Sequence, residues 1–79
     1  MVFLLRITHK INWGDFVLSI NDKCVMIESY KSVLFLSSEM IIIQLKQKLL
    51  KICGINLCVE YYTSEEIRII GDIHEIHFQ

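Results

Sequence analysis

The chain has 79 residues, a net charge of −1 and a hydrophobic content of 53%. A chain of this length predicts a single domain that spans residues 1–79. The eight basic residues are scattered rather than gathered on one face, so we expect no nucleic-acid partner. Because one small core cannot bury this much apolar surface, we expect part of it to lie against a partner protein or another copy of the chain.

The cysteines and the N-terminal residues favour a cytoplasmic protein. Cys24, Cys53 and Cys58 are odd in number, which favours reduced thiols over a disulfide framework. The pattern assigns them no role. The first ten residues, MVFLLRITHK, place their charges after a short apolar run. A signal peptide or a membrane span needs a longer apolar segment.

Apolar runs rich in Val, Ile, Tyr and Phe follow one another along the chain. They occur about every 8–9 residues, toward the short end of the spacing in all-β domains, at residues 2–7, 16–20, 24–29, 32–36, 40–45, 49–53, 56–62, 66–70 and 73–78. These residue types suit a pleated sheet. The pattern therefore predicts an all-β domain, built as a small antiparallel meander or sandwich of short strands. A solenoid-like stack of the same strands is the alternative architecture.

The breaks between the runs have the composition of tight turns. Asx residues tolerate the left-handed backbone of a turn, and glycine adopts it without steric cost. A polar stretch at residues 63–66 also separates two runs. We therefore expect structural turns at three further places, which are Asn21 with Asp22, Gly54 with Asn56, and Gly71 with Asp72.

Residues 39–53 fit a helix about as well as two strands. Polar residues recur there at helical spacing, at Gln44, Gln47, Lys48 and Lys51. Ser38 suits the cap before such a helix and Gly54 the position after it. Against the helix, Ile41, Ile42 and Ile43 are β-branched and lose rotamer freedom in helices. The periodicity leaves both an α+β fold with this helix and a pair of strands open.

Strand alternation assigns faces if the chain is all-β. Within residues 56–62, it predicts that Leu57, Val59 and Tyr61 share one face. The run MIIIQL at residues 40–45 is apolar on both faces. Left exposed, such a run would be prone to aggregation. It is therefore either a covered central strand or a contact surface, and we take its four aliphatic residues after Met40 as the candidate interface: Ile41, Ile42, Ile43 and Leu45.

The chain shows no pattern that predicts a catalytic, cofactor-binding or metal-binding residue. His74 and His77 are three positions apart, so on a strand they point to opposite faces and cannot chelate one ion. Glu65 and Glu66 are adjacent in a polar break, so we interpret them as solvent-exposed turn residues rather than as paired catalytic carboxylates. The glycines stand singly and form no phosphate-binding loop. We expect no enzymatic activity, no cofactor and no small-molecule substrate.

An ordered series of short motifs runs from about residue 20 to the end of the chain. It comprises CVMIESYKSVLFLSSEMIII at residues 24–43 and LLKICGINLCVEYYTSEEIRIIGDIHEIHF at residues 49–78. Within it lie an Ile-Glu strand end, a Tyr-Lys turn, a Ser-Ser-Glu turn, an Ile-Ile-Ile strand and two glycine-containing segments, at residues 27–28, 30–31, 37–39, 41–43, 50–57 and 66–73. In order and spacing these motifs resemble the YabP/YqfC family of sporulation proteins. Ser32 and Lys48 stand where that family commonly has glycine.

The resemblance implies a sandwich-like all-β domain that acts without catalysis. It favours two strands over the helix at residues 39–53, with a turn near Lys46–Lys48. It also implies a role in the mother cell in spore cortex or coat formation. The chain would then lie on the cytosolic side of the outer forespore membrane and serve as an interaction module for a membrane-embedded sporulation partner. A homo-oligomeric structural protein is the alternative function.

Overall fold

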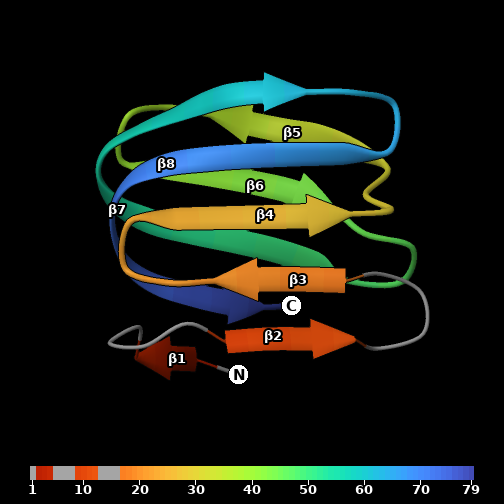
Figure 1. Ribbon diagram of the computed structural model, residues 1–79, viewed down its shortest axis with the longest axis horizontal. Helices are drawn as coiled ribbons and strands as arrows, with labels where there is room; N and C mark the ends of the chain where they lie inside the picture. Colours follow the sequence, from red (N-terminus) through yellow and green to blue (C-terminus); the bar gives the residue numbers. More distant parts are fainter. Residues whose placement is uncertain (1, 5–8, 13–16) are drawn as a thin grey trace.

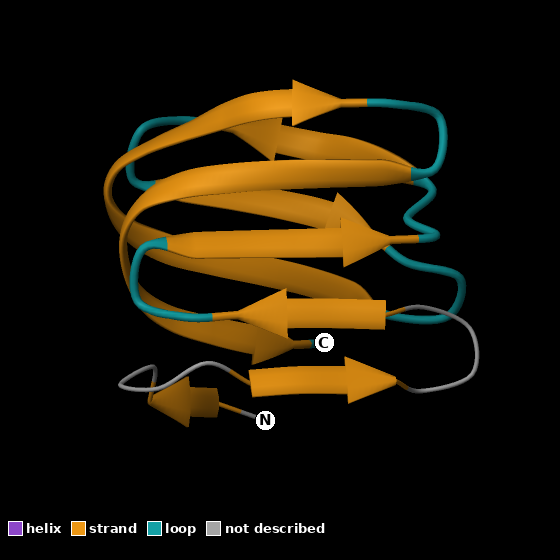
Figure 2. Ribbon diagram, viewed as in Figure 1, coloured by secondary structure: helices purple, strands orange, loops and turns teal. Residues whose placement is uncertain are grey.

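Apolar residues at every second position give this chain its strands. In β3 (Val17–Ile20) and β4 (Cys24–Glu28), buried residues alternate with more exposed ones, as in a strand with one face on a core. The computed structural model describes residues 2–4, 9–12 and 17–79. Within these residues the chain is all-β and contains no helix (Figure 2). The expected fold class is therefore confirmed, while parts of the runs predicted at 2–7 and 16–20 lie outside the described residues.

The strands join into one antiparallel sheet. Their order is β2-β3-β4-β8-β7-β6-β5, and β1 also pairs with β8. Antiparallel pairing of neighbouring strands excludes the solenoid-like stack. Besides β3 and β4, the strands are β1 (Val2–Leu4), β2 (His9–Asn12), β5 (Ser32–Leu36), β6 (Met40–Gln44), β7 (Leu49–Tyr62) and β8 (Glu66–Phe78).

Residues 39–53 form strands and a turn rather than a helix. The backbone N–H of Leu45 donates to the carbonyl oxygen of Lys48 across 2.8 Å. This bond closes the turn between β6 and β7, where the resemblance places it. The helix fails because Ile41 and Ile43 pair with Ile52 and Leu50 across the sheet, so the buried residues follow a period of two.

Two long strands, β7 and β8, fold the sheet over itself. The first part of β7 pairs with β6, whereas residues 58–62 pair with the first part of β8. Because both strands bend midway, one layer holds β2, β3, β4 and the halves of β7 and β8 next to their shared turn. The other layer holds β1, β5, β6 and the remaining halves (Figure 1). The result is the predicted small sandwich.

The core fills the space between the two layers and is wholly aliphatic. Among the described residues, no polar or charged residue is buried. The aliphatic composition agrees with the β-branched runs of the sequence. The buried residues are Leu18, Ile20, Val25, Ile27, Ile41, Ile43, Leu45, Leu50, Ile52, Leu57, Ile67, Ile69, Ile73 and Ile76.

The turn predicted at Asn21 and Asp22 lies between β3 and β4. Asn21 Oδ1 accepts a hydrogen bond of 2.8 Å from the backbone N–H of Lys23, as an Asx turn requires. The turn predicted at residues 63–66 joins β7 to β8, where Thr63 Oγ1 accepts from the backbone N–H groups of Glu65 and Glu66 at 3.1 and 3.0 Å. Sequence and structure agree at both turns.

The other predicted turns are corrected by the structure, since Gly54 and Asn56 lie inside β7, and Gly71 and Asp72 inside β8. They are bends at which each strand passes from one layer to the other. A Cβ atom on Gly54 would collide with the carbonyl oxygen of Asp72, and one on Gly71 would lie 2.6 Å from the carbonyl oxygen of Asn56. Glycine is needed here for close strand approach rather than for chain reversal.

Turns from elsewhere in the chain satisfy the backbone at these bends. The N–H of Gly54 donates to the carbonyl oxygen of Glu39 at 3.0 Å, in the β5–β6 turn. The N–H of Gly71 donates to the carbonyl oxygen of Lys23 at 3.1 Å, in the β3–β4 turn. Each bend therefore has a tertiary partner that replaces the interrupted ladder, as buried backbone groups require.

Candidate functional site

Strand β5 is an edge strand with all five residues exposed. Among the described pairings it hydrogen-bonds to β6 alone. Its sequence is nevertheless apolar, and Leu34, Phe35 and Leu36 are 55%, 49% and 58% exposed. An exposed apolar edge offers unpaired backbone groups to another strand. This feature is therefore the first component of a candidate site.

A bulge in β5 divides its side chains between the two faces of the sheet. Val33 lies opposite Ile43 and Leu36 opposite Ile41, and the register shifts between Val33 and Phe35. Because Ile41 and Ile43 are buried, Val33 and Leu36 face the inside of the sandwich. Phe35 lies opposite Ile42 and is therefore on the outer face.

A second bulge reverses the expected faces at the end of β7. The register shifts between Val59 and Tyr61, so Tyr61 lies opposite Arg68 and Tyr62 opposite Ile67. The prediction that Tyr61 shares the face of Leu57 and Val59 is thus wrong. Tyr62 lies on the inner face instead and is 72% exposed.

The inner faces of β5 and of the end of β7 border an apolar groove. Its volume is about 360 Å³, and Ile67, a core residue, forms part of its wall. We call β5, residues 59–62 of β7 and this groove the seam. There, β5 and the end of β7 lie at the edges of the two layers, with no ladder between them among the described pairings (Figure 1). The groove is lined by Tyr30, Lys31, Ser32, Val33, Leu36, Val59, Tyr62 and Ile67.

Tyr30 ties one end of the seam to the β7–β8 turn. Its hydroxyl donates a hydrogen bond of 2.7 Å to the carbonyl oxygen of Thr63. Its ring also packs against the core cluster. Both residues of the Tyr-Lys pair noted in the sequence therefore line the groove.

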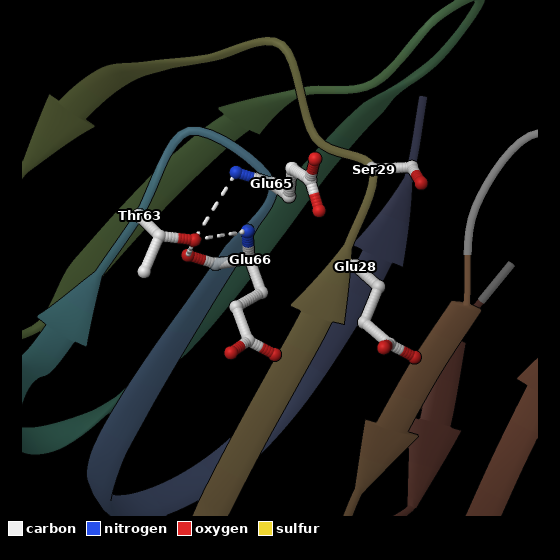
Figure 3. A pocket seen from close by; sticks show the side chains of 5 residues that line it. All are labelled: Glu28, Ser29, Thr63, Glu65 and Glu66. Carbon is white, nitrogen blue, oxygen red and sulfur yellow. Dashed lines mark hydrogen bonds between the residues drawn. The ribbon is translucent and has the colours of Figure 1, made fainter.

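An acidic hollow lies beside the seam, on the other side of that turn (Figure 3). It has a volume of about 620 Å³ and is lined by Glu28, Ser29, Thr63, Glu65 and Glu66. Glu28 and Glu66 stand directly opposite each other on β4 and β8. Like charges in such a pair destabilise a sheet slightly. The lining of the hollow includes the hydroxyls of Ser29 and Thr63 but no imidazole, and the Thr63 hydroxyl is engaged by the backbone N–H groups of Glu65 and Glu66.

The cysteines are free and lie apart from the seam. Cys24 and Cys58 flank Ile70 on either side, on β4 and β7. Cys24 and Cys53 are half-buried, while Cys58 is exposed. Cys53 lies in the other layer, opposite Met40. The structure gives them no shared chemistry.

The histidine motif near the end of β8 makes a local side-chain hydrogen bond. His77 Nε2 lies 2.9 Å from Glu75 Oε2, two positions away on the same strand. In the described part of the chain, no three His, Cys, Asp or Glu side chains form a group suited to a metal ion. That part also has no helix long and apolar enough to span a membrane.

At the bend of β8, an interaction between two surface side chains shifts the pKa values of both. Lys23 and Asp72 form an exposed ion pair. The hydrogen bond from Lys23, and then its charge, lowers the pKa of the Asp72 carboxyl. The same hydrogen bond raises the pKa of Lys23. This pair joins the β3–β4 turn to the bend and plays no part in the seam.

The expected interface is largely inside the protein. Ile41, Ile43 and Leu45 have no exposed surface, so they are core residues and unavailable to a partner. Ile42 is half-buried on the outer face of β6, between Phe35 and Lys51. A contact through Ile42 stays a prediction. The exposed apolar strand is instead the neighbouring strand β5, whose sequence SVLFL is also apolar on both faces.

Comparison of this chain with protein-family models, with curated proteins and with solved structures finds no match. The structure itself defines the class as an all-β antiparallel domain, and the seam is its candidate site.

Proposed function

We propose that this chain is a non-enzymatic interaction module that binds protein through the seam. The observation that carries the proposal is β5, an apolar edge strand exposed along its whole length. A strand added to such an edge gains main-chain hydrogen bonds, and the neighbouring groove selects its side chains. The groove beside β5 has the apolar lining that such selection requires.

The biological setting of the proposal is spore formation. The order of the motifs at residues 24–43 and 49–78 supports it through the resemblance to the YabP/YqfC family. In that setting, the chain works in the mother cell in cortex or coat formation. It is a peripheral protein at the outer forespore membrane and assembles with a membrane-embedded sporulation protein.

A homo-oligomeric structural role is the second candidate. The specific observation in its favour is the seam strand itself, because an exposed apolar edge strand offers its unpaired backbone groups equally to the same strand of a second copy. Both candidates use the seam as a protein-binding surface, and they differ in the chain that fills it.

The test is the production of heat-resistant spores by a spore-forming bacterium that carries the gene. We expect deletion of the gene to reduce the spore count, and an allele with Phe35→Lys to reproduce much of the loss. Ile55→Lys is the matched control, because Ile55 is also 49% exposed but lies on β7 outside the groove. A normal spore count in the deletion strain would refute the sporulation role. A normal count with Phe35→Lys alone would refute the role of the seam.

A further inference from the structure

Three side chains at the seam point into the sandwich and yet remain in water. Val33 and Leu36 of β5 lie opposite buried isoleucines of β6. Tyr62 of β7 lies opposite buried Ile67, so all three side chains are on the inner faces of their layers. They are 38%, 58% and 72% exposed, whereas no residue of the core cluster exceeds 4%. The core is therefore incomplete at the seam, and further apolar side chains would complete it.

Two strand edges flank this gap. Among the described pairings, β5 pairs with β6 alone, and residues 59–62 of β7 pair with β8 alone. No Cα atom of β5 lies within 8 Å of one in β7, whereas directly paired strands lie about 4.8 Å apart and second neighbours about twice as far. The two edges are thus too far apart to pair with each other.

The gap is also bounded. Tyr30, beside β5, reaches across it to the carbonyl oxygen of Thr63, beside the end of β7. Both edges border the same apolar groove of about 360 Å³ (Figure 1). A volume of this size is within the range of about 300–1,000 Å³ that is usual for binding pockets.

We propose that the seam receives one extended strand of a partner protein, which inserts between β5 and residues 59–62 of β7. The inference rests on the proposed function, that the seam binds protein, and it specifies the segment that is bound. One edge of the inserted strand hydrogen-bonds to β5 and the other to β7. Every second side chain enters the groove, because the side chains of a strand alternate between its faces.

The two edges and the groove between them select this occupant. An extended chain presents backbone N–H and C=O groups on both of its edges, whereas a helix satisfies its backbone groups internally. The groove is lined mainly by apolar and aromatic side chains, so the residues that enter it are apolar. The β5 strand of a folded second copy already has β6 on one of its edges, so it cannot pair on both. The occupant is therefore an unpaired segment in which apolar and polar residues alternate.

The experiment uses as its probe a short fluorescein-labelled peptide in which valines alternate with threonines between two terminal lysines. Fluorescence anisotropy with the full chain measures the Kd. We expect this peptide to bind at least roughly tenfold more tightly than one of the same composition whose valines are contiguous. Equal affinity for the two peptides would overturn the proposal.

Two variants locate the binding site of the alternating peptide. Leu36→Asp places a charge in the groove at a side chain that is more than half exposed, so we expect it to abolish binding with an unchanged far-UV CD spectrum. Ile55→Lys is the control outside the groove and should bind the peptide like the parent. Full binding by a folded Leu36→Asp variant would contradict insertion at the seam.

Backbone methylation distinguishes insertion between two edges from addition to one. Successive N–H groups of an extended peptide point to opposite edges. A peptide methylated at the valine nitrogens and another methylated at the threonine nitrogens therefore each lose the ladder on one side. Both should bind roughly tenfold more weakly than the parent peptide, because each loses one or two net hydrogen bonds. If either methylated peptide kept the parent affinity, the strand would be added to a single edge and the inference would fail.

The spore count separates this inference from the proposed function. If the alternating peptide shows no preference but Phe35→Lys lowers the count, the seam binds protein in another way and only the inserted strand is refuted. If the peptide binds as expected and Leu36→Asp abolishes binding but leaves the count normal, the inserted strand stands and the proposed role of the seam in sporulation fails.

Discussion

At the scale of single residues, two glycines decide whether the sheet can fold over itself. A Cβ atom added at Gly54 or Gly71 would meet backbone atoms of the opposite strand. Backbone cannot yield as a flexible side chain does, so any added methyl group forces β7 and β8 apart. Gly71 also has a φ of 139°, which L side chains rarely adopt.

We expect Gly54→Ala and Gly71→Ala each to destabilise the fold by at least the roughly 1–3 kcal/mol that overpacking costs. Asn56→Gly is the control, because its φ of 55° suits glycine, and we expect a change within about 1 kcal/mol. Urea unfolding followed by circular dichroism gives all three values. Wild-type stability in either alanine variant would contradict the close approach of the strands.

The ion pair at the bend of β8 gives a pH dependence of known sign. The pKa of Asp72 is lowered in the folded chain, so its contribution to stability is present above the ordinary pKa of aspartate, about 3.9. That contribution is lost as the pH falls through the folded pKa. Its size is small, because both side chains are exposed and solvent screens them.

We therefore expect wild type to be slightly more stable than Asp72→Asn at neutral pH and equal to it in strong acid. The unfolding midpoints of both proteins in urea, measured across the acidic range, give the difference at each pH. If the difference between the two midpoints stayed the same down to the most acidic condition, the charge of Asp72 would not contribute to the stability of the folded chain.

At the scale of elements, β5 and β6 have similar apolar sequences but differ in exposure, because they occupy different positions in the sheet. Both strands are apolar at nearly every position. β6 pairs with a strand on each side and its inner residues are buried, whereas β5 pairs with β6 alone among the described strands. The bulge near Leu34 then sets Phe35 on the outer face. Position in the sheet, rather than hydrophobicity, distinguishes the two strands.

Adjacent isoleucines of β6 should therefore respond differently to a charge. Ile43 is fully buried, so we expect Ile43→Lys to unfold the domain, since an unpaired buried ammonium costs several kcal/mol. Ile42 is half-buried on the outer face, so Ile42→Lys should stay folded. Thermal unfolding of both variants measures the contrast. Equal loss in both would mean that the outer face of β6 is covered.

Partner binding by Ile42→Lys tests the remaining part of the interface predicted from the sequence. If Ile42 contacts a second copy beside Phe35, the folded variant should self-associate more weakly than wild type. Sedimentation equilibrium of both proteins across a concentration series measures this effect.

At the scale of the whole molecule, two long strands join the layers of the folded sheet, while the seam leaves two strand edges unpaired among the described pairings. β7 and β8 pass through both layers and join them at the bends. At the seam, β5 and the end of β7 have no ladder between them among the described pairings. A small domain with a short core gains stability from covering such a surface.

Under the homo-oligomeric alternative, stability of the whole molecule should depend on protein concentration. If two copies share the seam, dimer formation favours the folded chain by mass action. In that case we expect the Tm of the wild-type chain to rise with concentration and that of Phe35→Lys to stay constant. Scanning calorimetry over a dilution series measures both. A constant Tm in the wild type would indicate that the seam does not self-associate under these conditions.

Local patterning was sufficient to predict much of this protein. The apolar runs rich in Val, Ile and Phe at residues 16–20 and 24–29 predicted strands, and Asn21-Asp22 marked a tight turn correctly. These features depend on interactions between residues near one another in the chain, or on a simple division between core and solvent. The fold class follows from them.

The candidate site required the tertiary structure. Glycine looks the same in a turn as in a strand bend, and the approach of Asp72 to Gly54 is visible only when β7 and β8 are paired. The bulges that turn Phe35 outward and Tyr62 inward arise from strand pairing. The sequence by itself determined which residues are apolar and that they form strands. The tertiary structure decided which apolar strand stays uncovered, because exposure depends on the neighbours that a strand acquires when the sheet folds over itself.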